Sequence, residues 1–244
     1  MTLLAGIQTA LDAIYPARCL TCGDRVDSDF GLCGPCWSET SFIGGAVCDG
    51  CGIPLPGFIG AEAAACDDCL HYPRPWELGR AALIYTGVGR KLVLALKHGD
   101  RQEIAKPAAL WMHNAIAGRI PENAIIAPVP LHPRRLLRRR YNQSALLAAA
   151  LAKRMEMSWC PDLLRRYKST QTLDGMTARE RWDTLHDAIS ITTGRSQRMI
   201  GRPVLLVDDV MTTGATLSAC ANACLAAGSG PISVVTLARV AKET

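Results

Sequence analysis

The sequence predicts an α/β protein in which a parallel sheet flanked by helices follows a small, cysteine-rich N-terminal domain. Apolar runs alternate with helical segments from residue 77 onward, which is typical of a parallel sheet covered on both faces. Upstream, eight of the 11 cysteines form four Cys-x-x-Cys pairs between Cys19 and Cys69. A chain of 244 residues, 49% of them hydrophobic, can bury one good core and a smaller one. We therefore expect two domains, residues 1–76 and residues 77–244.

The N-terminal segment Met1–Tyr15 predicts a short amphipathic helix that ends at Pro16. Its apolar residues recur at helical spacing and it carries no Lys or Arg, so we expect it to dock on its own protein and not on a membrane surface. It lacks the basic start and the cleavage site of a signal peptide, and no stretch of the chain is long and apolar enough to span a bilayer. We expect a cytoplasmic protein.

Metal binding explains the cysteine pattern better than disulfides do. Each Cys-x-x-Cys pair fits a thiolate knuckle, and two knuckles close one tetrahedral Zn²⁺ site, whose four thiolates leave no open position for a catalytic water. We expect two structural Zn²⁺ ions, each closed by neighbouring pairs in two ribbons in series. A cross-braced arrangement, first pair with third and second with fourth, fits the spacing too. The candidate ligands are Cys19, Cys22, Cys33, Cys36, Cys48, Cys51, Cys66 and Cys69.

Strands and helices are expected in alternation over residues 77–244. Apolar runs predict strands at Arg80–Thr86, Ala124–Pro130, Ala188–Thr192, Val204–Val207 and Ile232–Ala238. Helical spacing predicts helices at Gly87–His98, Glu103–Gly118, Asn142–Met157 and Ala215–Ala227. Val204–Val207 is expected to be the central strand.

The most informative stretch starts at that strand, where four apolar residues precede two carboxylates and a Thr/Gly turn. The turn is a helix N-terminus, whose backbone N–H groups and threonine hydroxyls suit phosphate oxygens. Asp208 and Asp209 would accept hydrogen bonds from ribose hydroxyls or reach a bridging Mg²⁺. Ribose 5-phosphate satisfies all of these groups. The candidate binding residues are Asp208, Asp209, Met211, Thr212, Thr213, Gly214, Ala215 and Thr216.

A basic run supplies a second candidate anchor. The net charge of +5 is split, since residues 1–76 hold 3 basic and 9 acidic side chains and residues 77–244 hold 24 and 13. Because a polyanion needs a basic footprint, we expect pyrophosphate or nucleic-acid phosphates at the C-terminal domain, and a scaffold or protein-docking role for the ribbons. The run follows a strand end and contains Arg134, Arg135, Arg138, Arg139 and Arg140.

Five sequence motifs, spread over nearly the whole chain, occur together in a combination that resembles a known family. They are the cysteine ribbons, Lys97-His98-Gly99-Asp100, Pro128-Val129-Pro130, Tyr141-Asn142-Gln143 and the Asp208-Asp209 run. The last looks like the phosphoribosyl pyrophosphate (PRPP) motif of type I phosphoribosyltransferases, and together they resemble the ComF family of ComFC- and GntX-like competence proteins. The resemblance implies a type I phosphoribosyltransferase fold behind a double zinc ribbon, PRPP with Mg²⁺ as ligand, and a link to DNA uptake.

The resemblance also implies roles for individual residues. Asp208 and Asp209 would bind the ribose hydroxyls, residues 211–216 the 5′-phosphate. The family's mobile loop matches Lys168–Arg181, where Arg179 and Arg181 would close over the ligand, although both would equally suit a solvated helix. The pyrophosphate would meet the loop made of Pro130, Leu131 and His132.

The chain departs from the family pattern at a few positions. Arg140 replaces the glycine of the usual Arg-Gly-Phe-Asn-Gln, and Leu173 and Thr184 stand where Gln and Asn are usual in the mobile loop. Thr212 stands where 6-oxopurine transferases carry an aspartate base, which disfavours hypoxanthine or guanine salvage.

Three classes of function follow. The first is an enzyme that displaces pyrophosphate from PRPP with an unidentified acceptor, using Asp208, Asp209, Arg179 and Arg181. The second is a non-catalytic protein that binds single-stranded DNA and has a regulatory or vestigial PRPP pocket. The third, an adaptor for DNA-uptake proteins through the ribbons alone, leaves the Asp-Asp-Thr-Thr loop without a purpose.

Overall fold

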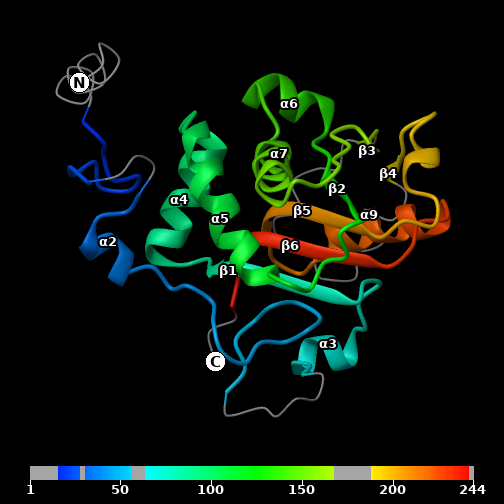
Figure 1. Cartoon of the computed structure of the whole chain (residues 1–244), viewed down its shortest axis with the longest axis horizontal. Helices are drawn as coiled ribbons and strands as arrows, with labels where there is room; N and C mark the ends of the chain where they lie inside the picture. The colour runs from blue at the N-terminus through cyan, green and yellow to red at the C-terminus, as the bar shows by residue number, and fades with distance from the viewer. Residues whose placement is uncertain (1–15, 28–30, 57–63, 168–187, 242–244) are drawn as a thin grey trace.

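The structure is a computed structural model that describes residues 16–27, 31–56, 64–167 and 188–241 (Figure 1). The helix expected at Met1–Tyr15 lies outside the described residues. So does the expected mobile loop with Arg179 and Arg181.

The core of the protein is a four-stranded sheet in which every pair of neighbours is parallel. The strand order is β1-β6-β5-β2, so β5 is an interior strand, as expected. This arrangement confirms the parallel sheet flanked by helices that the sequence predicts. The strands are β1 (Leu78–Ile84), β2 (Ile125–Pro128), β5 (Val204–Met211) and β6 (Ile232–Arg239).

Helices cover both faces of this sheet. Leu205 and Val207 of β5 pack in the cluster that contains α4 (Gly87–His98), α5 (Ala105–Ile116) and α7 (Gln143–Met155). Val204 and Leu206 face the other side, in the cluster that contains α9 (Ala215–Ala226). A small antiparallel pair, β3 (Leu164–Arg166) and β4 (Ile189–Ile191), lies on the α9 side. The described part of this domain also contains two 3₁₀ turns, η1 (Gln102–Ile104) and η2 (Ser196–Arg198).

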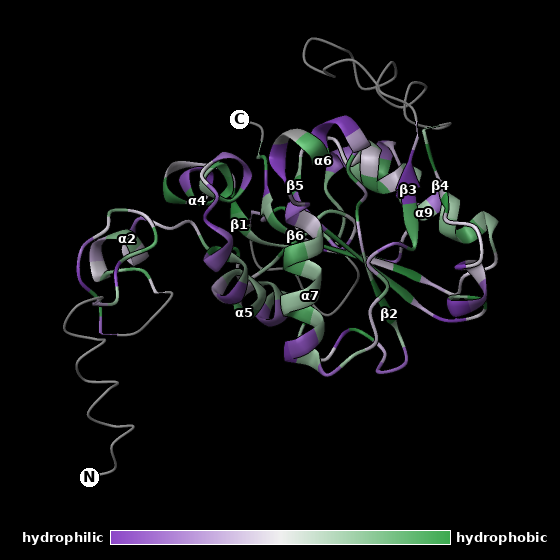
Figure 2. Ribbon diagram, turned by 90° about the horizontal axis from the view of Figure 1, so that it is seen from above, coloured by the Kyte–Doolittle hydropathy of each residue, from purple (hydrophilic) through white to green (hydrophobic). Residues whose placement is uncertain are grey.

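One helix of this domain was not expected from the sequence. The arginine run forms α6 (Pro133–Arg139), which begins with proline at its first position and has His132 as its N-cap. Figure 2 shows hydrophilic and hydrophobic residues side by side on α6, and Leu137 is 84% exposed. The helix therefore presents both charge and apolar surface to solvent.

The two cysteine ribbons pack on different parts of the sheet domain. In the first ribbon α2 (Gly34–Ser38) follows Cys33, and Leu20 joins the α4 and α5 cluster. In the second ribbon α3 (Asp67–His71) follows Cys66, and buried cysteines join the α9 cluster. Phe42, which lies between the two ribbons in the sequence, forms an antiparallel bridge with Leu83 at the outer edge of β1. The segment around Phe42 therefore covers part of this sheet edge.

None of the helices in the described part of the chain has the length and hydrophobicity that a membrane span requires.

Candidate functional site

The two carboxylates of β5 are held by side chains from different helices. Asp208 Oδ1 accepts hydrogen bonds from Ser144 Oγ at 2.7 Å and from the Asp209 backbone N–H at 2.9 Å. Asp209 Oδ1 lies 3.1 Å from Lys97 Nζ, at the end of α4. The start of α7 and the end of α4 therefore position the acidic pair at the carboxyl end of the sheet, where open α/β folds bind ligands.

The environment of Asp208 favours its protonated form. Burial raises its pKa to about 7, and the negative charge of Asp209 adds to the shift, while the hydrogen bond from Ser144 and the charge of Lys97 oppose it. A carboxyl with this pKa can gain or lose a proton near neutral pH. A ligand that donates hydroxyl hydrogen bonds to it would favour the ionised form.

The turn after β5 is held from behind by two arginines. Arg239 donates to the carbonyl oxygens of Met211, at 3.1 Å, and of Thr212, and Arg74 donates to that of Thr213 at 2.8 Å. A trans peptide unit is planar, so its N–H points away from its C=O. The N–H groups that follow these three carbonyls therefore face the other side of the turn, where they can meet an anion.

The turn leads into the N-terminus of α9. Gly214 is the N-cap residue with φ of +82°, and the Ala215 N–H donates to Thr213 Oγ1 at 3.4 Å. The left-handed backbone favours glycine here, and a Cβ at Gly214 would lie 3.0 Å from Arg74 Nη1, so the guanidinium would have to shift to admit a side chain. The 12-residue helix adds the positive end of its dipole to the turn. We call residues 211–216, where the sequence predicts phosphate binding, the phosphate loop.

The segment before α7 connects the site to its surroundings. Asn142 caps α7 by accepting from the Ser144 N–H at 3.0 Å, and donates to the Val129 carbonyl at 3.0 Å. The Tyr141 hydroxyl donates to the Leu96 carbonyl at 2.7 Å. The four short motifs that carry the family resemblance outside the ribbons therefore meet at one end of the sheet.

The loop after β2 starts beside the acidic strand. The Val129 N–H donates to the Val207 carbonyl at 2.9 Å, and Pro130, Leu131 and His132 follow. His132 Nδ1 accepts from the Arg134 N–H at 3.2 Å, so its ring caps α6. The structure thus places this loop between the carboxylates and the arginine helix.

The predicted arginines lie along and after α6. Arg134 and Arg140 are exposed and Arg135 is half-buried; the side chain of Arg138 lies outside the described residues. Arg140 has φ of +65°, the left-handed conformation that glycine adopts without strain, and it stands at the position where the resemblance leads us to expect glycine. An open pocket of about 230 Å³ lies at this end of the helix, lined by Lys97, His98, Asp100, Arg139 and Arg140.

Sequence reasoning missed several residues of the site. Ser144, Arg74 and Arg239 had no motif that pointed to them. Arg166 of β3 is buried: burial and the charge of Arg135 lower its pKa, while Cys220 and Asp208 act in the opposite direction. A further guanidinium therefore lies within the electrostatic field of the acidic pair.

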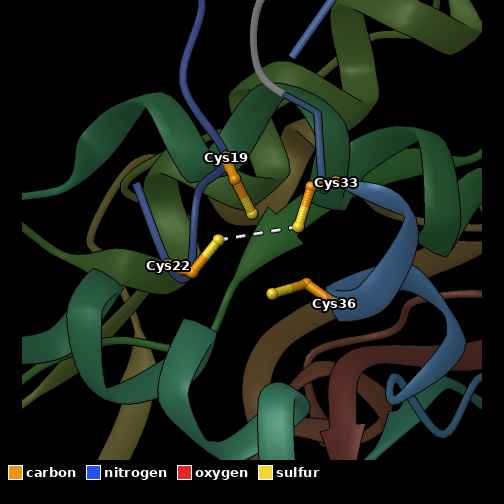
Figure 3. Close-up of side chains that lie close together, drawn as sticks. All are labelled: Cys19, Cys22, Cys33 and Cys36. Atoms are coloured by element: carbon orange, nitrogen blue, oxygen red, sulfur yellow. Dashed lines mark hydrogen bonds between the residues drawn. The ribbon is translucent and has the colours of Figure 1, made fainter. Parts of the chain in front are cut away.

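The eight cysteines of the Cys-x-x-Cys pairs form two separate groups of four, and within each group the Sγ atoms lie within 4.8 Å of one another. Figure 3 shows the first group, in which the four sulfurs point toward one another. Neighbouring pairs come together, so the ribbons are in series and the cross-braced alternative is wrong. The groups are Cys19, Cys22, Cys33 and Cys36, and Cys48, Cys51, Cys66 and Cys69.

The spacing of the sulfurs fits Zn²⁺. The Cys22 and Cys33 Sγ atoms are 3.5 Å apart and those of Cys51 and Cys66 3.6 Å, too far for a disulfide. Tetrahedral Zn²⁺ with Zn–S bonds of about 2.3 Å has S···S edges of about 3.8 Å. The Cys66 N–H donates to Cys48 Sγ at 3.3 Å, a bond that favours a thiolate. Both groups are therefore structural zinc-binding sites.

A comparison with known protein families supports the cysteine ribbons. Residues 10–70 match the double zinc ribbon domain family. The chain is similar to a solved adenine phosphoribosyltransferase from Thermoanaerobacter pseudethanolicus, at 18% identity over 59% of this chain and 83% of that one, with a TM-score of 0.36.

Relatives match over nearly their whole length. The chain is 31% identical to the DNA utilization protein YhgH of Salmonella typhi, over 87% of this chain and 92% of that protein. It is 29% identical to Competence protein F of Haemophilus influenzae, over 91% and 96%. The chain therefore belongs to the ComF family, the family of these competence and DNA utilization proteins.

Proposed function

We propose that the protein binds PRPP with Mg²⁺ at the carboxyl end of β5. Asp208 and Asp209 accept hydrogen bonds from the ribose hydroxyls, and the phosphate loop binds the 5′-phosphate through its backbone N–H groups. One observation carries this proposal. The carbonyl oxygens of residues 211–213 all accept hydrogen bonds from guanidiniums, so the N–H groups that follow them face the opposite side of the turn, where the proposed 5′-phosphate would bind.

The reaction that suits this site is transfer of the phosphoribosyl group to an acceptor, with release of pyrophosphate. The bond from C1 to pyrophosphate breaks and a bond from C1 to the acceptor forms, through an oxocarbenium-like transition state. Charge stabilisation and positioning are the main contributions that the protein can make. The loop of Pro130, Leu131 and His132, with the arginines that follow, would bind the pyrophosphate. Mg²⁺ would supply additional positive charge, and Arg179 and Arg181 would close over the ligand.

A second function, binding of single-stranded DNA in the cytoplasm during DNA uptake, is favoured by the surface of α6. Exposed arginines flank Leu137, which is 84% exposed, so phosphates and bases could both be contacted. Residues 77–244 carry 24 basic and 13 acidic side chains, a net charge of +11. Under this proposal the PRPP pocket is regulatory or vestigial.

Calorimetric titration of PRPP with Mg²⁺ tests the first function. We expect micromolar binding to the wild-type protein and its loss in the double variant Asp208→Asn, Asp209→Asn. Asp162→Asn is the matched control, because this exposed carboxylate pairs with Arg195 away from the loop. Unchanged affinity in the double variant would contradict the site assignment. If the wild type binds, release of pyrophosphate in the presence of candidate acceptors tests turnover.

The salt dependence of oligonucleotide binding tests the second function. The logarithm of the binding constant falls linearly with the logarithm of the salt concentration. For a single strand, each lost phosphate contact should make this slope less steep by about 0.7. We expect this in the pair Arg134→Ala, Arg140→Ala. The pair Lys153→Ala, Arg154→Ala removes the same charge from exposed positions at the end of α7 and should leave the slope unchanged. Equal slopes in both variants would exclude α6 as the DNA surface.

A further inference from the structure

The second ribbon is fixed to the sheet domain close to the phosphate loop. The Trp76 indole N–H donates to the Gly50 carbonyl at 2.7 Å, and the Gly79 N–H donates to the Asp49 carbonyl at 2.6 Å. A Cβ at Gly79 would lie 2.3 Å from the Gly50 carbonyl oxygen, so only glycine allows this approach. The backbone of the ribbon between two of its ligands therefore rests directly on the start of β1.

Arg74 connects the zinc ligands of this ribbon with the phosphate loop. Its Nε donates to Cys69 Sγ at 3.4 Å, and its Nη1 donates to the Thr213 carbonyl at 2.8 Å. The guanidinium carbon lies 5.8 Å from the centroid of the Trp76 ring, and the same guanidinium covers Gly214. One side chain thus touches a metal ligand, the anchoring tryptophan and the N-cap of α9.

Arg239 holds the other half of the phosphate loop and faces the same metal site. It is buried, and it donates to the carbonyl oxygens of Met211 and Thr212. The positive charge of Arg239 also interacts electrostatically with Cys51 of the second cysteine group. Both guanidiniums that orient the loop therefore lie in the field of the second cysteine group.

The described part of the first ribbon packs on a different region of the sheet domain. Leu20 and Phe42 pack toward α5, where the Phe42 and Trp111 rings meet edge to face at 5.5 Å. Arg18, which precedes the first ligand of this ribbon, donates to the Gly23 carbonyl inside its own ribbon at 3.0 Å. Within the described ranges, no hydrogen bond joins the first ribbon to residues 211–216.

We propose that Arg74 is a positioning residue that couples the second zinc site to the phosphate loop, so that metal in the second ribbon, and not in the first, sets how well the loop binds an anion. A Zn²⁺ with four thiolates carries a net charge of −2, which holds the guanidinium between Cys69 and Thr213. Without metal, Cys69 is no longer fixed by coordination, and the guanidinium that it accepts a hydrogen bond from loses its anchored partner. The inference rests on the proposed function for its anion, PRPP, but the coupling itself concerns the loop.

Arginine is required for this coupling because of its shape. Its planar fork directs N–H groups toward two acceptors in fixed directions, whereas lysine has a single mobile ammonium. Arg74→Lys should therefore retain the charge but not the connection. This variant separates positioning of the loop from simple electrostatic attraction of the ligand.

Three variants of the full-length zinc-loaded protein test the role of Arg74. We expect Arg74→Ala and Arg74→Lys to keep two Zn²⁺ per chain and to increase hydrogen exchange across residues 211–216. PRPP affinity should fall about tenfold in both, which corresponds to one charged hydrogen bond of about 1.4 kcal/mol. Arg18→Ala, the matched control in the first ribbon, should change neither exchange nor affinity.

Removal of one ligand from each zinc site tests the role of the metal. Cys69→Ser should increase exchange of the phosphate loop and weaken PRPP binding, whereas Cys22→Ser should lose one Zn²⁺ with the loop unaffected. Equal effects of the two would overturn the inference, as would unchanged loop exchange in both Arg74 variants. If wild-type protein fails to bind PRPP while loop exchange still rises in the Arg74 variants, the proposed function fails and the coupling stands.

Discussion

Lys97 Nζ lies 3.1 Å from Asp209 Oδ1, and this ion pair joins the last turn of α4 to the acidic end of β5. Burial raises the pKa of the neighbouring Asp208, and the charge of Lys97 opposes this rise. Lys97 therefore acts on both carboxylates, by direct contact with one and through space on the other.

Replacement of this lysine should shift the pH at which PRPP binds. Without its charge the pKa of Asp208 rises further above its usual range, so Lys97→Met should require a higher pH for half-maximal PRPP affinity. Calorimetry between pH 6 and pH 8.5 measures this shift. Lys91→Met, on the exposed side of the same helix, is the control and should leave the pH profile unchanged.

Asp208 should make the protein less stable as the pH rises toward neutrality. Its folded-state pKa, raised to about 7, lies above the usual 3.8, so between these values the folded state binds more protons than the unfolded state and stability falls with pH. Asp208→Asn removes this contribution. Urea unfolding at several values from pH 5.5 to pH 7.5 should therefore show a smaller decline in the free energy of unfolding for the variant. A parallel decline in both proteins would contradict the pKa direction.

Arg140→Gly should stabilise the fold and weaken nucleic-acid binding. The left-handed backbone at φ of +65° costs a non-glycine residue about 1 kcal/mol. Glycine removes this cost, but it also raises the conformational entropy of the unfolded chain, which offsets part of the gain in stability. We expect a gain of about 0.5 kcal/mol by urea unfolding. Arg134→Gly, at the start of α6 with ordinary helical backbone, should give no gain.

Gly214→Ala should be more harmful than Gly228→Ala. Both glycines have left-handed backbones, with φ of +82° and +86°, so both variants share a backbone cost of about 1 kcal/mol. Only at Gly214 does the added Cβ meet a neighbour, Arg74 Nη1 at 3.0 Å. The difference in PRPP affinity and in thermal midpoint between the two variants isolates this contact. Equal losses would show that the contact is unimportant.

Metal analysis should find about two Zn²⁺ per chain, from eight thiolates at four per ion. Chelation should remove both ions and lower the midpoint of thermal unfolding, because the four cysteines of each ribbon would lose the metal ion that holds them together. A value of one or none would contradict the two sites. Cys160→Ser, outside both groups, is the control and should leave the zinc content unchanged.

The extent of β5 shows what hydrophobic patterns can and cannot predict. The apolar run predicts a strand that ends at Val207, but pairing with β6 continues through Asp208↔Thr236 and Met211↔Arg239. Backbone hydrogen bonds do not depend on side-chain polarity, so a strand can pass through charged residues that end the apolar pattern. The acidic pair is therefore part of a rigid strand and not of a loop.

The arginines behind the phosphate loop could not be found from sequence patterns. Arg74 stands between Pro73 and Pro75, which indicate a linker, and its partner Thr213 is 139 positions away. Local periodicity carries no information on such a contact. The front of the site was predictable because its donors and carboxylates follow one another in a single run.

The order of the sheet has a consequence for how the chain is made. β1 follows directly after the second ribbon, yet its partner in the sheet is β6, where Leu78 pairs with Ser233. All eight metal ligands lie between Cys19 and Cys69 and leave the ribosome long before β6 does. The nascent ribbons can therefore bind Zn²⁺ before β6 is synthesised and pairs with β1. A shortage of zinc during translation would thus affect folding before the ligand-binding end of the sheet has formed.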